Sequence, residues 1–343
     1  MKPFDIIATV SPRVVTDEFL HGFVERGVTT LRINGAHADP PEARRLIGLI
    51  RGSIGREAQV LIDLPGSKIR TANLATPIPL YGGEPFTLEA TQFNYPGFLS
   101  YLRPGQVLLA SDGKLQFVVD ACDANRVSLT PRFTGVLENN KGVHIVGAHP
   151  EGLPFLFERD HALIEVAKES GAELVGLSFV RGPEDVRQAR RLLEGSGVDA
   201  ICKIETPEAC KRLADILPLT ARVLVDRGDL AAGIGIYRLP SMERAVAKQA
   251  ARRGVKVYVA TQILFNMVEH PTPLMAEVAS LHEVLGYADG LQFSEETSIG
   301  KYPLEVLEVV QQMRVQVADV EGAADVRRGD PEALGQRSGV EAG

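Results

Sequence analysis

The stretch "ICKIETPEACKRLADILPLTARVLVDRGDL", residues 201–230, holds two short apolar runs that each end in charged side chains. The apolar runs predict strands at residues 200–204 and 222–225, and the helical period between them predicts a helix at residues 207–217. Two strands that are joined through a helix are typical of a parallel sheet. The stretch therefore predicts a β-α-β unit with charge at the carboxyl end of each strand.

The same alternation of strand and helix runs through most of the chain. Further strands are predicted at residues 5–10, 30–33, 60–64, 174–179, 255–260 and 290–293, and further helices at 17–26, 41–50, 161–170, 183–194, 241–253 and 273–286. Strands that alternate with helices in this number predict an α/β fold, a (β/α)8 TIM barrel.

The interval from residue 71 to residue 152 breaks the alternation. It is rich in Gly, Pro, Thr and Asn, and its "SDGK" is a hairpin signal between two alternating runs. We expect a small inserted domain there, β-barrel-like, that forms a lid over the carboxyl ends of the barrel strands. The predicted domains are thus 1–70 and 153–317 for the barrel and 71–152 for the lid, with a disordered tail at 318–343.

Composition excludes several classes of protein. The formal net charge of −7 and the lack of a dense Lys/Arg block disfavour a nucleic-acid partner. The three cysteines lack the spacing of a zinc site or a disulfide framework. No apolar run is long enough for a membrane span and "MKPFDIIATV" lacks signal-peptide features, so we expect a cytoplasmic protein with no membrane partner.

Charged side chains recur at the carboxyl ends of the predicted strands, which meet at one mouth in a barrel. Glu205 and Asp229 would form a carboxylate pair for a hard divalent cation, in the usual style of magnesium. Arg32, Arg70 and Lys203 would surround that cation. Each motif is weak alone, and "RGD" at 227–229 is most often a turn, but together they indicate a site for a polyanionic substrate, most simply a phosphate being transferred.

The chain resembles the pyruvate kinase family. The resemblance rests on collinear stretches with matching spacing from residue 5 to about residue 312: "IIATVSP", "GVTTLRINGAH", "LIDLPGSKIRT", "ASDGKLQFVV", "NNKGVHIVG", "LPFLFERD", "VGLSFVRGPEDV", "ICKIETPEA", "VLVDRGDL", "VYVATQILFNMVEHPTP" and "FSEETSIGKYPLEVL". It implies a magnesium-dependent (or manganese-dependent) phosphotransferase that acts on phosphoenolpyruvate, or a related enol or keto acid, with ADP or ATP. The family's C-terminal regulatory domain has no counterpart after residue 312, so we expect a short form, and a homodimer.

The resemblance also implies roles for single residues. Glu205 and Asp229 match the metal ligands, and the catalytic residues would be Lys203, Thr261 and Arg32. The substrate would contact Arg32, Thr261 and the backbone of Gly228 and Asp229. The nucleotide would contact Arg70, Asn34, His37 and, from the lid, Lys141 and Asp112.

Lys68 in "GSKIR" matches the lysine of family members that work without potassium. Ala36 and Leu64 stand where potassium-dependent members have two oxygen ligands, and an ammonium can take the cation's electrostatic role. We therefore expect no potassium requirement.

The rim of the site departs from the family. Asp226 replaces the alanine of "ARGDLG" and Glu295 the glycine of "SGET", and we place both among the substrate-contacting residues. Like-charge repulsion would weaken binding of a trianion by about 1 kcal/mol or more for each, unless the side chains turn away into salt bridges. Three functions stay open: the phosphotransferase, a lyase or aldolase-type enzyme that stabilises a pyruvate-like enolate without a nucleotide, and a non-catalytic metabolite-binding paralogue.

Overall fold

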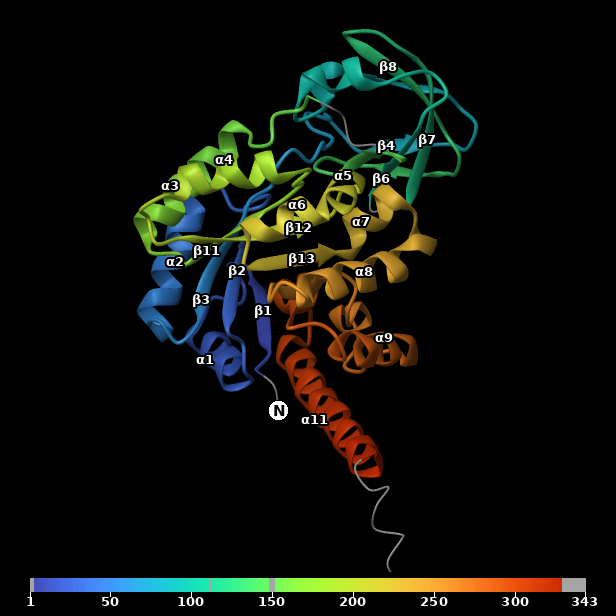
Figure 1. The fold of residues 1–343 in the computed structure, drawn as a ribbon. Coiled ribbons are helices and arrows are strands. Elements are labelled where there is room, and N and C mark those ends of the chain that lie inside the picture. Colours follow the sequence, from blue (N-terminus) through green and yellow to red (C-terminus); the bar gives the residue numbers. More distant parts are fainter. Residues whose placement is uncertain (1–2, 112, 148–151, 329–343) are drawn as a thin grey trace, which may run out of the picture.

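The computed structural model describes residues 3–111, 113–147 and 152–328, and eight parallel strands among them close into a barrel (Figure 1). The strand order is β1-β15-β14-β13-β12-β11-β3-β2. The bounds are β1 Asp5–Val10, β2 Thr30–Asn34, β3 Gln59–Asp63, β11 Leu174–Leu177, β12 Asp199–Ile204, β13 Arg222–Asp226, β14 Lys256–Ala260 and β15 Gly290–Phe293. The predicted (β/α)8 barrel is confirmed.

The barrel strands are buried on both faces, which explains their almost continuous apolar runs. Side chains such as Ile7, Leu61, Ile201 and Leu224 fill the barrel interior. The outer faces of the strands pack against a ring of helices: α1 Asp17–Glu25, α2 Pro40–Ile54, α3 Glu158–Ser170, α4 Pro183–Leu193, α8 Leu239–Ala251, α9 Met275–Leu285 and α11 Pro303–Arg328. This closed core gives the strand ends a fixed frame.

The inserted domain lies between β3 and β11, as the sequence predicts. A five-stranded antiparallel sheet has the order β10-β6-β7-β8-β5, and β4 pairs with β9. The elements are β4 Ile78–Leu80, β5 Phe86–Glu89, η1 Ala90–Gln92, η2 Pro96–Tyr101, β6 Val107–Ala110, β7 Leu115–Cys122, β8 Arg126–Pro131, β9 Gly135–Leu137 and β10 Val143–Ile145. Phe93, Phe98 and Phe117 belong to a core of its own. Figure 1 shows this domain at one end of the barrel.

Three local predictions differ from the structure. The helix predicted at 207–217 is broken into α5 Pro207–Lys211, α6 Leu213–Ile216 and η3 Leu217–Leu219, because Arg212 leaves the helical region. Residues 227–229, read as a turn, begin helix α7 Arg227–Ile234. The tail predicted from residue 318 continues α11 as far as Arg328, where Ala, Glu and Arg favour helix without an apolar period. Residues 329–343 lie outside the described part of the chain.

Among the described residues, no helix combines the length and the apolar character that a membrane span requires.

Two short segments complete the barrel mouth, namely η5 Phe265–Val268 after β14 and α10 Glu295–Ser298 after β15. η4 Ile236–Arg238 links α7 to α8.

Candidate active site

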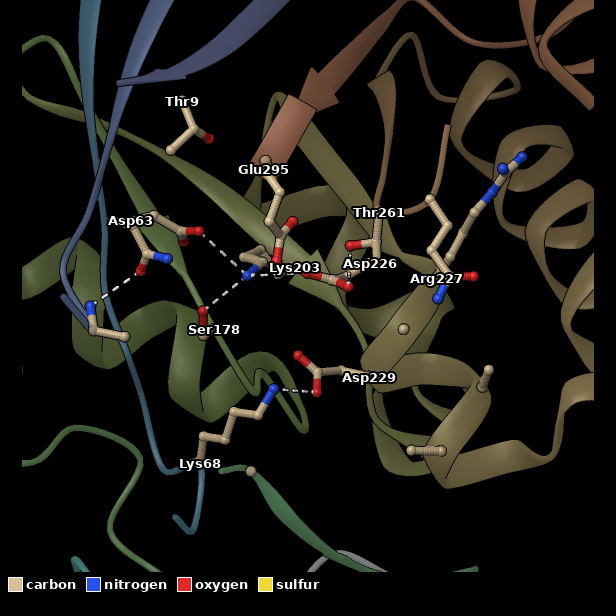
Figure 2. Close-up of a pocket in the computed structure, with 18 of the residues that line it drawn as sticks. Thr9, Asp63, Lys68, Ser178, Lys203, Asp226, Arg227, Asp229, Thr261 and Glu295 are labelled. Carbon is tan, nitrogen blue, oxygen red and sulfur yellow. Dashed lines mark hydrogen bonds and ion pairs between the residues drawn. The ribbon is translucent and has the colours of Figure 1, made fainter. Parts of the chain in front are cut away.

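Lys203, near the end of β12, is at the centre of a charged cluster at the barrel mouth (Figure 2). Its Nζ lies 3.4 Å from Asp63 Oδ2, 3.3 Å from Glu205 Oε2 and 3.4 Å from Asp226 Oδ2. It also donates a hydrogen bond to Ser178 Oγ at 3.1 Å. Burial lowers the pKa of Lys203, but the three carboxylates outweigh it and hold the pKa above its ordinary value. The lysine is therefore a buried, permanent positive charge.

Arg32 on β2 is held by a buried chain of polar contacts. Its Nε donates to Asp63 Oδ2 at 2.7 Å, and its Nη1 donates to Thr9 Oγ1 at 2.7 Å. The Thr9 hydroxyl in turn donates to the carbonyl of Phe293 at 2.6 Å. Arg32 and Lys203 thus share one carboxylate, and the pKa of Asp63 stays below its ordinary value although burial opposes this. Thr9 has no role in the sequence-based prediction, because a lone threonine in a strand carries no signal.

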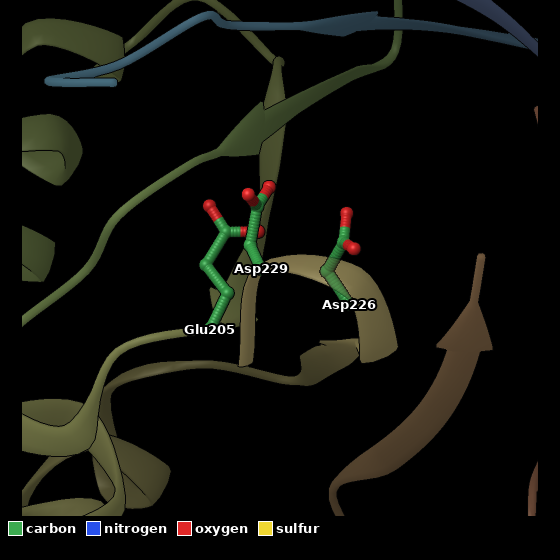
Figure 3. A group of neighbouring side chains, drawn as sticks. All are labelled: Glu205, Asp226 and Asp229. Atoms are coloured by element: carbon green, nitrogen blue, oxygen red, sulfur yellow. The ribbon is translucent and has the colours of Figure 1, made fainter. Parts of the chain in front are cut away.

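Three carboxylates gather beside Lys203, where the sequence predicted two. Glu205, Asp226 and Asp229 each offer one oxygen, and these oxygens all lie within 4.8 Å of one another (Figure 3). Glu205 Oε1 accepts the backbone N–H of Phe179 at 2.7 Å. Its Oε2 is buried and accepts no hydrogen bond in the described structure, although Lys203 is near. Burial raises the pKa of Glu205 to about 8, against the opposing charge of Lys203 and with the help of Asp229 and Asp226.

Asp229, in the first turn of α7, joins the barrel to the lid. Lys68 Nζ donates to Asp229 Oδ1 at 2.5 Å, and His144 Nε2 on lid strand β10 lies 3.3 Å from the same oxygen. Burial alone would raise the pKa of Asp229, but Lys68 and His144 hold it well below its usual range. The lysine predicted to replace potassium therefore lies at the carboxylate of Asp229, one of the two predicted metal ligands. The sequence predicts no role for His144, because a single histidine in a short strand carries no signal.

Asp226 is the N-cap residue of α7 but does not cap it. An aspartate at this position commonly accepts a hydrogen bond from the first turn, whereas the side chain of Asp226 makes no such bond. Its Oδ1 instead accepts the hydroxyl of Thr261 at 2.8 Å, and its Oδ2 faces Lys203. Asp226 does form a salt bridge, but its partner Lys203 lies inside the cluster, so the side chain faces the site and does not turn away from it.

Thr261 has a strained backbone at the end of β14. Its φ is +75°, a conformation that β-branched residues rarely adopt. The next residue, Gln262, has φ of +55°. Such strain is typical of functional sites, where the surrounding structure holds a side chain in place. Here it directs the threonine hydroxyl to Asp226.

The start of α7 presents backbone amides close to Thr261. The first N–H groups of a helix have no partner within the helix and form an anion site. A Cβ atom on Gly228 would lie 3.1 Å from Thr261 Cγ2, so only glycine leaves the present spacing undisturbed. Arg227 points away from Lys203 and Asp229, and its Nη2 pairs with buried Glu243 at 3.1 Å. The hydroxyl of Tyr287 also bonds to Glu243, so this network fixes the start of the helix.

Barrel and lid enclose a cavity of about 1290 Å³ above the cluster. All predicted site residues that the structure describes line it except Glu205, which is buried. Glu295 lines it as an exposed side chain, and none of the ion pairs of the described residues includes it. Figure 2 shows its side chain extending from α10 into the mouth of the barrel.

The four predicted nucleotide-binding residues lie on the wall of this cavity, each with a local partner. Arg70 Nη1 donates to the carbonyl of Asn140 at 3.1 Å, and Lys141 pairs with Glu138 at 2.9 Å. Asn34 Oδ1 accepts the N–H of Ala36 at 3.0 Å. Burial, together with Arg70 and Arg32, lowers the pKa of His37. Asp112, the other predicted lid residue, lies outside the described residues.

Comparison with known proteins agrees with this arrangement. Residues 1–307 match the family model described as "Pyruvate kinase, barrel domain". The chain is 32% identical to the pyruvate kinase of Mycobacterium intracellulare over 336 residues, which are 93% of this chain and 71% of that protein. It is 31% identical to the pyruvate kinase of Thermotoga maritima, with 91% of this chain and 70% of that protein covered. It is 32% identical to pyruvate kinase 2 of a Synechocystis species, with 92% of this chain and 57% of that protein covered.

Proposed function

This chain belongs to the pyruvate kinase family, and from that premise we propose that it is a magnesium-dependent phosphotransferase. Its substrates would be phosphoenolpyruvate, or a related enol or keto acid, and ADP or ATP. The observation that carries the proposal is the position of Lys203 Nζ, buried among carboxylates at the mouth of the barrel and open to a cavity shared with the lid. Phosphoryl transfer is catalysed mainly by positioning and by charge stabilisation, which such a site can supply.

The donor set fits a divalent cation. Oxygen ligands suit magnesium and manganese, and Glu205 Oε2 is a buried acceptor without a hydrogen-bond donor in the described structure. Glu205 and Asp229 would hold the ion, which when bound would supply positive charge to the oxygens of the substrate.

The chain's own groups would then act on the substrate. Lys203 and Arg32 would neutralise charge on the phosphoryl group in transit. The amides of Gly228 and Asp229, at the start of α7, would bind the carboxylate of the substrate. Thr261 would hold a proton at its hydroxyl beside the carbon that gains or loses one.

The nucleotide would occupy the part of the cavity between the barrel rim and the lid. Arg70 and Lys141 offer positive charge there, and His37 and Asn34 lie on the same wall. A neutral His37, favoured by its burial and by the two nearby arginines, would contact the nucleotide as a hydrogen-bonding group.

A coupled assay tests the proposal. With Mg²⁺, phosphoenolpyruvate and ADP, we expect ATP formation that the Lys203→Ala variant loses. A wild-type rate equal to that of the variant would exclude ordinary pyruvate kinase activity.

Lys68 would replace potassium in this enzyme. Its ammonium already neutralises Asp229, so replacing potassium by tetramethylammonium chloride at constant ionic strength should leave the rate unchanged. A rate that rises on adding potassium would contradict this part of the proposal.

One observation favours a second candidate function, enolate chemistry without a nucleotide. Asp226 accepts the Thr261 hydroxyl at 2.8 Å, so a carboxylate base stands behind the threonine. A lyase or aldolase-type enzyme would use this pair on a pyruvate-like enolate. Calorimetry discriminates the two, since ADP or ATP binding supports the phosphotransferase and its absence supports the lyase.

We also propose a homodimer. Exposed apolar side chains at Ile236, Tyr237, Leu274 and Met275 flank helices α8 and α9, and a partner subunit would cover them. Light scattering should give twice the mass of one chain, and Tyr237→Lys with Met275→Lys should shift it to the monomer.

A further inference from the structure

We propose that Asp226 is a direct ligand of the divalent cation, so that this chain holds the ion on three carboxylates, those of Glu205, Asp226 and Asp229. The inference deepens the proposed metal site and rests on it. It concerns a side chain that the sequence marked as a departure from the family.

The three carboxylates come from separate elements and converge on one point. Glu205 follows β12, Asp226 ends β13 and Asp229 lies in the first turn of α7. One oxygen of each lies within 4.8 Å of the others. Octahedral ligands at about 2.1 Å from magnesium are about 3.0 Å apart when adjacent and about 4.2 Å when opposite. An adjacent pair at the 4.8 Å limit would therefore close by about 1.8 Å on binding, a change on the scale of side-chain rotation.

Glu205 supplies an independent sign that the cluster is suited to bind a cation. Its side chain is fully buried, and its Oε2 has no hydrogen-bond donor among the described residues. Lys203, 3.3 Å away, divides its single charge among three carboxylates. A buried carboxylate oxygen in this situation is an available ligand atom.

The charges of the cluster are unbalanced without a metal. With every carboxylate ionised, as metal ligands are, Asp63, Glu205, Asp226 and Asp229 carry four negative charges against the three positive charges of Arg32, Lys68 and Lys203, a formal total of −1. A divalent cation changes this to +1. Asp226 is the carboxylate by which the acidic groups outnumber the cations, and it thereby favours cation binding before any anionic substrate arrives.

Asp226 is also free to bind. It does not cap α7, and its Oδ1 uses one acceptor position for Thr261. Its Oδ2 faces Lys203 at 3.4 Å, which is long for a charged hydrogen bond. Coordination by Oδ2 would replace this loose contact and leave the bond to Thr261 in place.

Manganese binding measures the role of Asp226 directly. Free Mn²⁺ is quantified by electron paramagnetic resonance during titration of the full chain, without phosphoenolpyruvate or nucleotide. We expect Asp226→Asn to weaken binding at least about tenfold, since the loss of an outer-shell partner of a metal ligand already costs about ten- to a hundredfold in affinity. Water proton relaxation should show an additional exchangeable water on the ion in this variant.

Glu295→Gln is the matched control, because it removes a negative charge from the same mouth but lies outside the three-carboxylate group. We expect its affinity to stay within about twofold of wild type, since exposed charges are screened. Equal losses in both variants would mean that Asp226 acts only through long-range charge, and no loss in Asp226→Asn would also overturn the proposal. Circular dichroism verifies that each variant is folded, and Asp226→Ala replaces Asp226→Asn if the amide does not fold.

This experiment is independent of the proposed reaction. A protein that forms no ATP but loses manganese affinity in Asp226→Asn would retain the three-carboxylate site and lose the phosphotransferase assignment. A protein that forms ATP while Asp226→Asn binds manganese like wild type would retain the phosphotransferase assignment and lose the three-carboxylate site.

Discussion

Removal of the negative charge at Asp226 should tighten the binding of a phosphate-bearing substrate. Asp226 Oδ2 lies 3.4 Å from Lys203 Nζ, the group that would contact the phosphoryl oxygens. A phosphoryl oxygen at about 2.8 Å from that nitrogen would lie at most about 6 Å from the carboxylate. The carboxylate therefore repels the substrate and also occupies the lysine that should bind it.

The magnitude follows from Coulomb's law. Two unit charges about 6 Å apart interact by about 3 kcal/mol at an effective dielectric constant of about 20, and by under about 1 kcal/mol in bulk water. The site is between these limits, because Lys203 is buried while the cavity above it is open. An intermediate value near 1.4 kcal/mol corresponds to a tenfold change in affinity. Asp226→Asn should thus lower the dissociation constant of phosphoenolpyruvate about tenfold, and more at low ionic strength.

Isothermal titration calorimetry is suited to this measurement, since the chain contains no tryptophan for a fluorescence signal. The titration is done at saturating Mn²⁺, so that weaker metal binding in the variant does not mask the effect. Oxalate, which carries no phosphoryl group, serves as the control ligand and should respond less. Unchanged or weaker binding of phosphoenolpyruvate to Asp226→Asn would refute the electrostatic reasoning.

Three further predictions concern neighbouring residues. Lys203→Met should lower the free energy of unfolding by about 3 kcal/mol, because buried carboxylates lose their shared cation, and addition of Asp226→Asn should restore part of the loss in a urea titration. Gly228→Ala should reduce kcat/KM about tenfold with a nearly unchanged melting temperature, since its Cβ would displace Thr261; unchanged kinetics would show that this contact is not critical. The lowered pKa of His37 means that the folded state binds fewer protons than the unfolded state, so the contribution of His37 to stability is present above pH 6.5 and is lost as the pH falls below it. In melting curves measured across this pH range, His37→Asn should lose less stability than the wild type as the pH falls. Equal losses in the two proteins would contradict the assignment.

The barrel is predictable from sequence because its signal is repeated along the chain. Strands such as β12 and β13 are apolar runs bounded by charge, and each predicted barrel strand lies within two residues of an observed one. The errors occur where the local pattern and the tertiary structure differ. Arg212 interrupts an apolar period that continues to Leu217, and the residues of α7 contain two glycines that lower helix propensity.

The site is predictable only in part, since sequence gives the position of a residue on an element and not its partners. The gathering of Lys203, Glu205 and Asp229 follows from their places at strand ends of a barrel. The contact of His144 with Asp229 depends on how the lid is seated, and no local pattern encodes it. The hydrogen bond from Thr261 to Asp226 depends on a positive φ that the residue type would not predict.

The position of Asp226 connects metal binding and anion binding in one site. With its carboxylates ionised the cluster carries a formal charge of −1, and Lys203 is engaged by three carboxylates. A divalent ion on Glu205, Asp226 and Asp229 would reverse the sign of the charge and release Lys203 from two of those carboxylates. An alanine in place of Asp226 would make the cluster less negative by one charge and better able to accept an anion on its own. The carboxylate therefore makes binding of the phosphate-bearing substrate depend more strongly on prior binding of the metal, because the ion offsets part of the repulsion that Asp226 introduces.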